Sequence, residues 1–113
     1  MFREFIRMPE FEKCWEKLGL DETDIVELEK YLCIYPLSGN LIKGTSGLRK
    51  LRWALPNRGK RSSLRVINVD FVFYEKLYLI AVYSKNEKEN LSMKEKNEIK
   101  TLIKILEDSI RRK

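Results

Sequence analysis

Lysines and arginines are concentrated in one stretch of this chain. Of its 23 basic and 17 acidic residues, residues 43–65 hold eight basic side chains and no acidic one, so the rest is slightly acidic. No aspartate or glutamate occurs between Glu29 and Asp70. A local excess of positive charge attracts a polyanion, and nucleic acid is the polyanion that such stretches typically bind. The alternative is a solvated basic surface without a ligand, although ordinary surfaces mix both signs.

The residue types restrict the chemistry that this stretch can perform. The chain contains no histidine, which excludes Ser–His and Cys–His nucleophile pairs and the usual zinc sites. We therefore expect no metal and no cofactor. Catalysis would have to use lysine, arginine, tyrosine, glutamate or backbone groups. Cys14 and Cys33 are too few for a disulfide framework, so we expect both thiols to be reduced.

Length and composition indicate a small globular protein. With 113 residues and 43% hydrophobic side chains, the chain is expected to form a single domain, residues 1–113, around one core. Its apolar runs are too short to cross a bilayer, and acidic residues interrupt the N-terminal region where a signal peptide is apolar. We therefore expect no membrane association, no export signal and a cytoplasmic location.

Three segments have the apolar spacing of amphipathic helices. The first begins at Pro9, a residue favoured in the first turn. The second follows Asp21, a good N-cap, and ends before Pro36, so that the two form an αα-hairpin. The third follows Ser92, whose spacing to Glu95 is that of a capping box.

Residues 2–6, 48–55, 64–74 and 77–84 are expected to be strands, with a tight turn at Glu75 and Lys76 and loops over 37–47 and 56–63. The last two strands are apolar on both faces, which indicates that helices cover the sheet. We predict a small α+β domain. Its antiparallel curved sheet combines the N-terminal strand with a three-strand meander, and the αα-hairpin and the C-terminal helix pack on it.

Alternation in the strand 48–55 places Lys50 and Arg52 on one face, and Leu51 and Trp53 on the other. The concave face of the sheet is expected to gather the cations of this region. These are Lys50, Arg52, Arg58, Lys60, Arg61, Arg65 and Lys85, with Tyr83 close in sequence and Lys43 and Arg49 in the same basic stretch. Several cations on rigid strands beside an aromatic ring suit single-stranded RNA better than a duplex groove.

The strings GTSGLRKLRWA, RGKRSSLRVI and LYLIAVYSKNEKENLS resemble the RelE/ParE superfamily of bacterial toxins, most closely its HigB-type branch. The likeness follows the order of elements along the chain, and its specific part is residues 44–92. The resemblance implies a type II toxin that cuts messenger RNA at the ribosomal A site. It also implies a cognate antitoxin, in this branch usually a helix-turn-helix protein of the HigA kind.

The resemblance also implies which residues act. Lys50 and Arg52 match the paired cations of the first meander strand, Arg65 matches the arginine that opens the next strand, and Lys85 lies near the basic position after the last strand. Forked, permanently charged guanidinium groups can hold the phosphate oxygens while the RNA 2′-hydroxyl attacks phosphorus. Lys50 is then the candidate general base or general acid.

Two positions depart from the family pattern. Asn86 occupies the position at which the well-studied members have an arginine. Ser92 occupies the position at which they have a tyrosine, and Tyr83 is the candidate to replace that tyrosine. Two other functions are therefore compatible with the resemblance. One is inhibition of DNA gyrase, as in ParE-like relatives, although the retained cations count against it. The other is a non-catalytic relative that binds RNA or an antitoxin.

Overall fold

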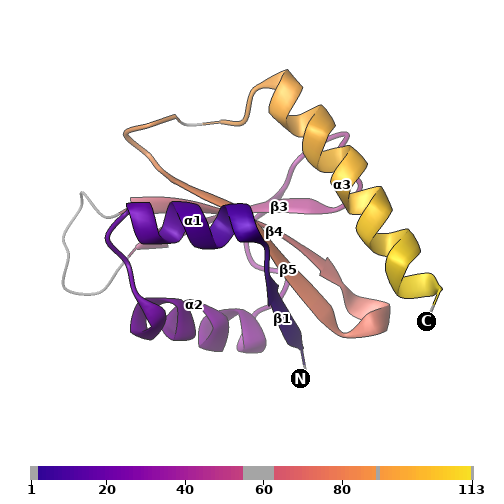
Figure 1. The fold of residues 1–113 in the computed structure, drawn as a ribbon, viewed down its shortest axis with the longest axis horizontal. Helices are drawn as coiled ribbons and strands as arrows, with labels where there is room; N and C mark the ends of the chain where they lie inside the picture. Colours follow the sequence, from indigo (N-terminus) through magenta and orange to yellow (C-terminus); the bar gives the residue numbers. More distant parts are fainter. Residues whose placement is uncertain (1–2, 55–62, 89, 113) are drawn as a thin grey trace.

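The computed structural model describes residues 3–54, 63–88 and 90–112 (Figure 1). Within these residues, five strands form one sheet in the order β1–β5–β4–β3–β2. The strands are β1 (Glu4–Arg7), β2 (Asn40–Leu41), β3 (Leu48–Ala54), β4 (Ser63–Phe71) and β5 (Lys76–Ser84). The α-helices are α1 (Pro9–Lys17), α2 (Glu22–Ile34) and α3 (Met93–Arg111). The predicted small α+β fold is confirmed.

The centre of the sheet is the antiparallel meander β3–β4–β5 that the sequence predicts. The turn between its last two strands differs from the expectation. β4 ends at Phe71, and a 3₁₀ turn, η2 (Val72–Tyr74), follows it. The N–H of Glu75 donates to the carbonyl of Val72 at 3.1 Å and closes this turn. The predicted strand to residue 74 is therefore too long, because the chain turns with a 3₁₀ geometry that apolar residues also adopt.

The sheet is mixed and not wholly antiparallel, because β1 runs parallel to its neighbour β5. Glu4 pairs with Lys76 and Arg7 pairs with Leu79. A parallel pair needs a long connection, and here two helices and three strands lie between the partners. The expectation of an antiparallel N-terminal strand was wrong because strand direction depends on this connection and not on the composition of the strand.

The predicted loop over residues 37–47 contains the short strand β2, which pairs with Arg49 and Lys50 of β3. Gly39 precedes it with a φ of +90°, and a Cβ atom there would lie 2.7 Å from the carbonyl oxygen of Lys50. We expect Gly39→Ala to lower the free energy of unfolding in urea by about 2–4 kcal/mol, since it adds a clash to the left-handed backbone.

Gly44→Ala is the matched control for this substitution. Gly44 also has a positive φ, +73°, but among the described residues no heavy atom beyond Gly44 and its two chain neighbours lies within 4 Å of the Cβ position. In the control variant the free energy of unfolding should fall only by the cost of the left-handed backbone, about 1–2 kcal/mol. Equal losses in the two variants would contradict the argument that close approach to β3 requires glycine at position 39.

The three helices begin where the sequence predicts. Asp21 and Asp24 form a capping box at the start of α2, and Ser92 and Glu95 form another at the start of α3. Pro9 is the first residue of α1. Local side-chain bonds to the first free N–H groups therefore specify both capped helices.

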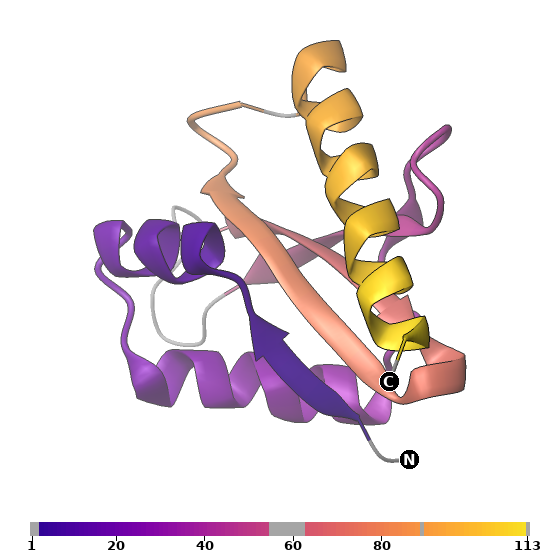
Figure 2. The same ribbon diagram turned by 45° about the vertical axis from the view of Figure 1, so that its right-hand side comes forward.

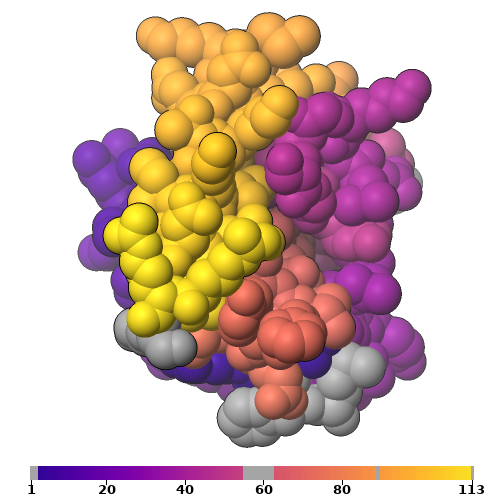
Figure 3. All heavy atoms as spheres, turned by 90° about the vertical axis from the view of Figure 1, so that its right-hand side faces the viewer, coloured from indigo at the N-terminus to yellow at the C-terminus, as the bar shows by residue number. Residues whose placement is uncertain are grey.

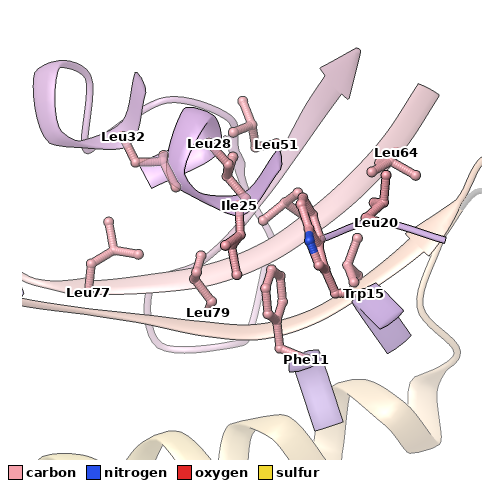
Figure 4. Close-up of a cluster of buried hydrophobic side chains, with 12 residues drawn as sticks. Phe11, Trp15, Leu20, Ile25, Leu28, Leu32, Leu51, Leu64, Leu77 and Leu79 are labelled. Atoms are coloured by element: carbon pink, nitrogen blue, oxygen red, sulfur yellow. The ribbon is translucent and has the colours of Figure 1, made fainter. Parts of the chain in front are cut away.

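The helices cover both faces of the sheet, as the two-sided apolar strands indicate. Helices α1 and α2 pack on one face, where Phe11, Trp15 and Leu28 share one buried cluster with Leu64 and Leu79 of the strands (Figure 4). Helix α3 packs on the other face (Figure 3). Its core residues include Ile103 and Ile110, together with Leu48, Ile67, Val69 and Tyr78 of the strands. The candidate site has to lie where α3 leaves this second face accessible.

An extra residue in β5 changes its side-chain alternation. Ile67 pairs with Ala81 and Asn68 pairs with Leu79, so Ile80 has no partner in β4. Such a β-bulge shifts the facing of every later residue in the strand. Ile80 and Tyr83 therefore both belong to the α3 core, although strict alternation would separate them.

Candidate nucleic-acid interface

Four predicted site residues lie on the α3 face of the sheet, at one end of the meander. Arg52 of β3 is paired with Arg65 of β4, which is paired with Tyr83 of β5. Directly paired residues on strands about 4.8 Å apart project to the same face. Tyr83 belongs to the α3 core, so the row faces α3. Lys50 lies two residues before Arg52 in β3, so its side chain projects to the same face. We call these four residues the basic row.

The two arginines of the basic row differ in exposure. Arg65 is 3% exposed, whereas Arg52 is exposed. The Nη1 group of Arg65 donates to the Ser63 hydroxyl at 3.1 Å and to the Leu64 carbonyl at 3.4 Å. Like charges on directly paired residues destabilise a sheet, so an anion held between the two guanidinium groups is favoured. The basic row therefore places the fixed guanidinium of Arg65 next to the accessible guanidinium of Arg52, an arrangement that suits binding of a phosphate group.

The segment that leads into α3 contacts the basic row. The Nζ group of Lys50 donates to Oδ1 of Asn90 at 2.7 Å. Lys88 lies with its Nζ 5.0 Å from the centre of the Tyr83 ring and forms an ion pair with Glu95. The hydrogen bond from Lys88 lowers the pKa of the Glu95 carboxyl group. Sequence reasoning missed Lys88, because a loop has no regular side-chain repeat that predicts the direction of a side chain.

Of the other predicted residues, the structure places Lys85 near the row and Lys43 away from it. The N–H of Lys85 donates to the carbonyl of Ser63 at 3.1 Å, which places this exposed residue at the same end of the sheet. Lys43 is exposed in the loop that precedes β3, at the opposite end of that strand from Arg52. The predicted RNA contacts Arg58, Lys60 and Arg61 lie outside the described residues.

Arg49 projects to the opposite face of β3, and its Nη1 group donates to the carbonyl of Gly39 at 3.0 Å. For the RNA cleavage that the sequence resemblance implies, we expect Arg49→Ala to change the rate by less than about threefold. Arg52→Ala should reduce it by about 100-fold, the loss typical of one donor to a transition state. Initial rates on ribosome-bound message test this, with urea unfolding as the check on stability. An equal loss of activity in two equally stable variants would place Arg49 in the site.

Within the described residues, no group of three or more Cys, Asp or Glu side chains is arranged to hold a metal ion. No described helix is both long and apolar enough to span a bilayer. The groups of the basic row are able to supply charge, hydrogen bonds and a transferable proton. Guanidinium groups supply permanent charge and paired donors, and the Lys50 amine can exchange a proton.

No protein-family model matches this chain. Among solved structures, the chain is similar to the free form of a substituted variant of the toxin RelE from E. coli. The TM-score is 0.56 at 18% sequence identity, and the match covers 79% of this chain and 90% of that chain. The chain therefore has a RelE-like fold.

Proposed function

We propose that this protein is the toxin of a type II toxin–antitoxin system, a ribosome-dependent endoribonuclease that inhibits translation in the cytoplasm. The observation that carries this proposal is the pairing of Arg52 with Arg65 beside Lys50 on one face of the sheet. The RelE-like fold supports it, as does the sequence resemblance to the HigB-type branch.

The proposed reaction uses the groups of the basic row, the RNA and water. The 2′-hydroxyl loses its proton and its oxygen attacks the adjacent phosphorus, while the bond to the 5′-oxygen breaks and that oxygen gains a proton. The products are a 2′,3′-cyclic phosphate and a 5′-hydroxyl. Arg65 and Arg52 bind the non-bridging oxygens, each contributing about 3–4 kcal/mol in the transition state. Lys50 exchanges one of these two protons, as general base or general acid, and water exchanges the other.

Tyr83 and Lys85 have different proposed tasks. We assign Tyr83 to positioning, because its ring supports Lys88 and it is paired directly with Arg65. Lys85 is exposed at the end of β5, where its charge can contact the RNA backbone next to the scissile link. The proposed partners are the ribosome with its message and a helix-turn-helix antitoxin of the HigA kind.

Induced expression in a bacterium that lacks the antitoxin tests the proposal. We expect growth arrest, and primer extension on ribosome-bound message should show new 5′ ends within codons. The fragments should carry 2′,3′-cyclic phosphate and 5′-hydroxyl termini. Growth arrest with intact message, together with loss of supercoiling by gyrase, would show the ParE-like activity instead. A harmless product would show a non-catalytic relative.

A further inference from the structure

In Figure 2 the second half of β5 runs between α1 and α3. Residues of these three elements line a groove there, with β5 as its floor. It forms because β1 pairs only with Lys76–Leu79 of β5. The N–H of Met8 makes the last bond to Leu79, and Pro9 then starts α1 and turns the chain away. The floor beyond Leu79 therefore has helices and no strand on that side in the described chain. The cavity volume is about 710 Å³, within the range of binding sites.

The lining of the groove combines an apolar floor with an acidic rim. The apolar side chains come from β5, from α3 and from the residues just before α1 and α3, and they include Met8, Ile80, Val82, Leu91, Ile99 and Leu102. Among the described lining residues, the charged ones are Glu10, Glu87, Glu95, Glu98 and Lys88. Four carboxylates and one ammonium give the groove a net charge of −3, in a protein of charge +6.

The charges of the rim are not internally balanced. Lys88 is paired with Glu95, and Glu10, Glu87 and Glu98 are exposed to solvent. Burial and the neighbouring Glu10 carboxylate raise the pKa of the Cys14 thiol, so this residue adds no positive or negative charge near neutral pH. A polyanion such as RNA is therefore repelled from the groove, while a cationic ligand is attracted.

We propose that this groove binds a segment of a partner protein that carries apolar side chains flanked by lysine or arginine. The apolar floor buries the partner's aliphatic side chains, and the three exposed carboxylates pair with its cations at the rim. This inference does not depend on the proposed RNA cleavage. Because Tyr83 and Lys88 also line the groove, the bound segment lies directly beside the basic row.

Binding of designed peptides to the full chain tests the proposal. The probe is a fluorescein-labelled peptide of alternating leucines and lysines, and its control has glutamate in place of lysine. Anisotropy should show saturable binding of the lysine peptide and none of the glutamate peptide. The lysine peptide should also slow alkylation of Cys14, which lines the groove, and leave that of Cys33 unchanged.

Charge reversal locates the binding. Glu10→Lys/Glu98→Lys alters one groove residue on each of α1 and α3, and we expect it to weaken peptide binding about tenfold or more. Glu12→Lys/Glu107→Lys makes the same change in net charge on the same helices, outside the groove, and should leave binding within about twofold.

Three results would overturn the proposal. One is the absence of binding by the lysine peptide, and another is equal weakening in both double variants. The third is a dimer of the chain alone, seen by sedimentation and dissociated by Glu10→Lys/Glu98→Lys, because a second copy would then be the occupant. None of these outcomes bears on whether the basic row cuts RNA.

Discussion

Replacement of Arg65 by alanine is expected to abolish growth inhibition and to reduce cleavage of ribosome-bound message by at least about 100-fold. Arg65 is the buried arginine of the basic row, held by hydrogen bonds to Ser63 and Leu64, so its guanidinium is already placed before RNA binds. Donors fixed in advance contribute most in the transition state. The measurement is primer extension at matched toxin and ribosome concentrations.

Two further variants separate chemistry from folding. Arg65→Lys keeps the charge and loses the forked geometry, so we expect a loss of about tenfold. Arg52→Ala removes an exposed side chain, so a loss of activity there cannot come from a cavity in the core. If Arg65→Ala retained full toxicity and a normal urea transition, Arg65 would have no part in the reaction.

Replacement of Asp70 by alanine is expected to lower the free energy of unfolding by about 3–5 kcal/mol. Asp70 of β4 forms a buried ion pair with Arg3, which precedes β1, and the side chains are 1% and 4% exposed. Nε of Arg3 lies 2.7 Å from Oδ1, and Nη2 lies 3.1 Å from Oδ2. The hydrogen bond to Asp70 raises the pKa of Arg3, so loss of the carboxylate leaves a buried charge.

Urea unfolding measures this loss, and a double variant identifies its cause. Arg3→Met/Asp70→Leu replaces both charges with apolar groups and should recover most of the stability, because no buried charge remains. Glu27→Ala breaks an exposed pair with Lys30, 3.6 Å apart, and should change the free energy of unfolding by less than about 1 kcal/mol. A loss below about 1 kcal/mol in Asp70→Ala would show that water reaches the pair.

Sequence reasoning predicts the helices of this protein well, because their signals are local. The capping residues Asp21 and Ser92 each satisfy N–H groups within the same turn, and Pro9 fits only the first turn. The strands β3, β4 and β5 are also predicted, β3 from its alternation of basic and apolar residues and the other two from their β-branched and aromatic residues. The direction of β1 depends on β5, a partner far away in the sequence, and β2 has only two residues, so no local pattern specifies either pairing.

The candidate site is predicted in its residue types and only partly in its geometry. Alternation within β3 puts Lys50 and Arg52 together, and the structure agrees with that facing. The pairing of Arg52 with Arg65 depends on the register between β3 and β4, which the intervening loop sequence does not specify. The bulge at Ile80 decides the facing of Tyr83, and nothing in the apolar run of β5 marks it.

The parallel pairing of β1 with β5 has a consequence for how the nascent polypeptide acquires its structure. The ion pair between Glu4 and Lys76 joins residues that are 72 positions apart. Contacts of such high contact order form slowly, and during synthesis they must wait for the later partner to emerge. The hairpin α1–α2 can fold early, but β1 and the basic row remain incomplete until β5 has been translated. The basic row therefore forms only at a late stage of co-translational folding.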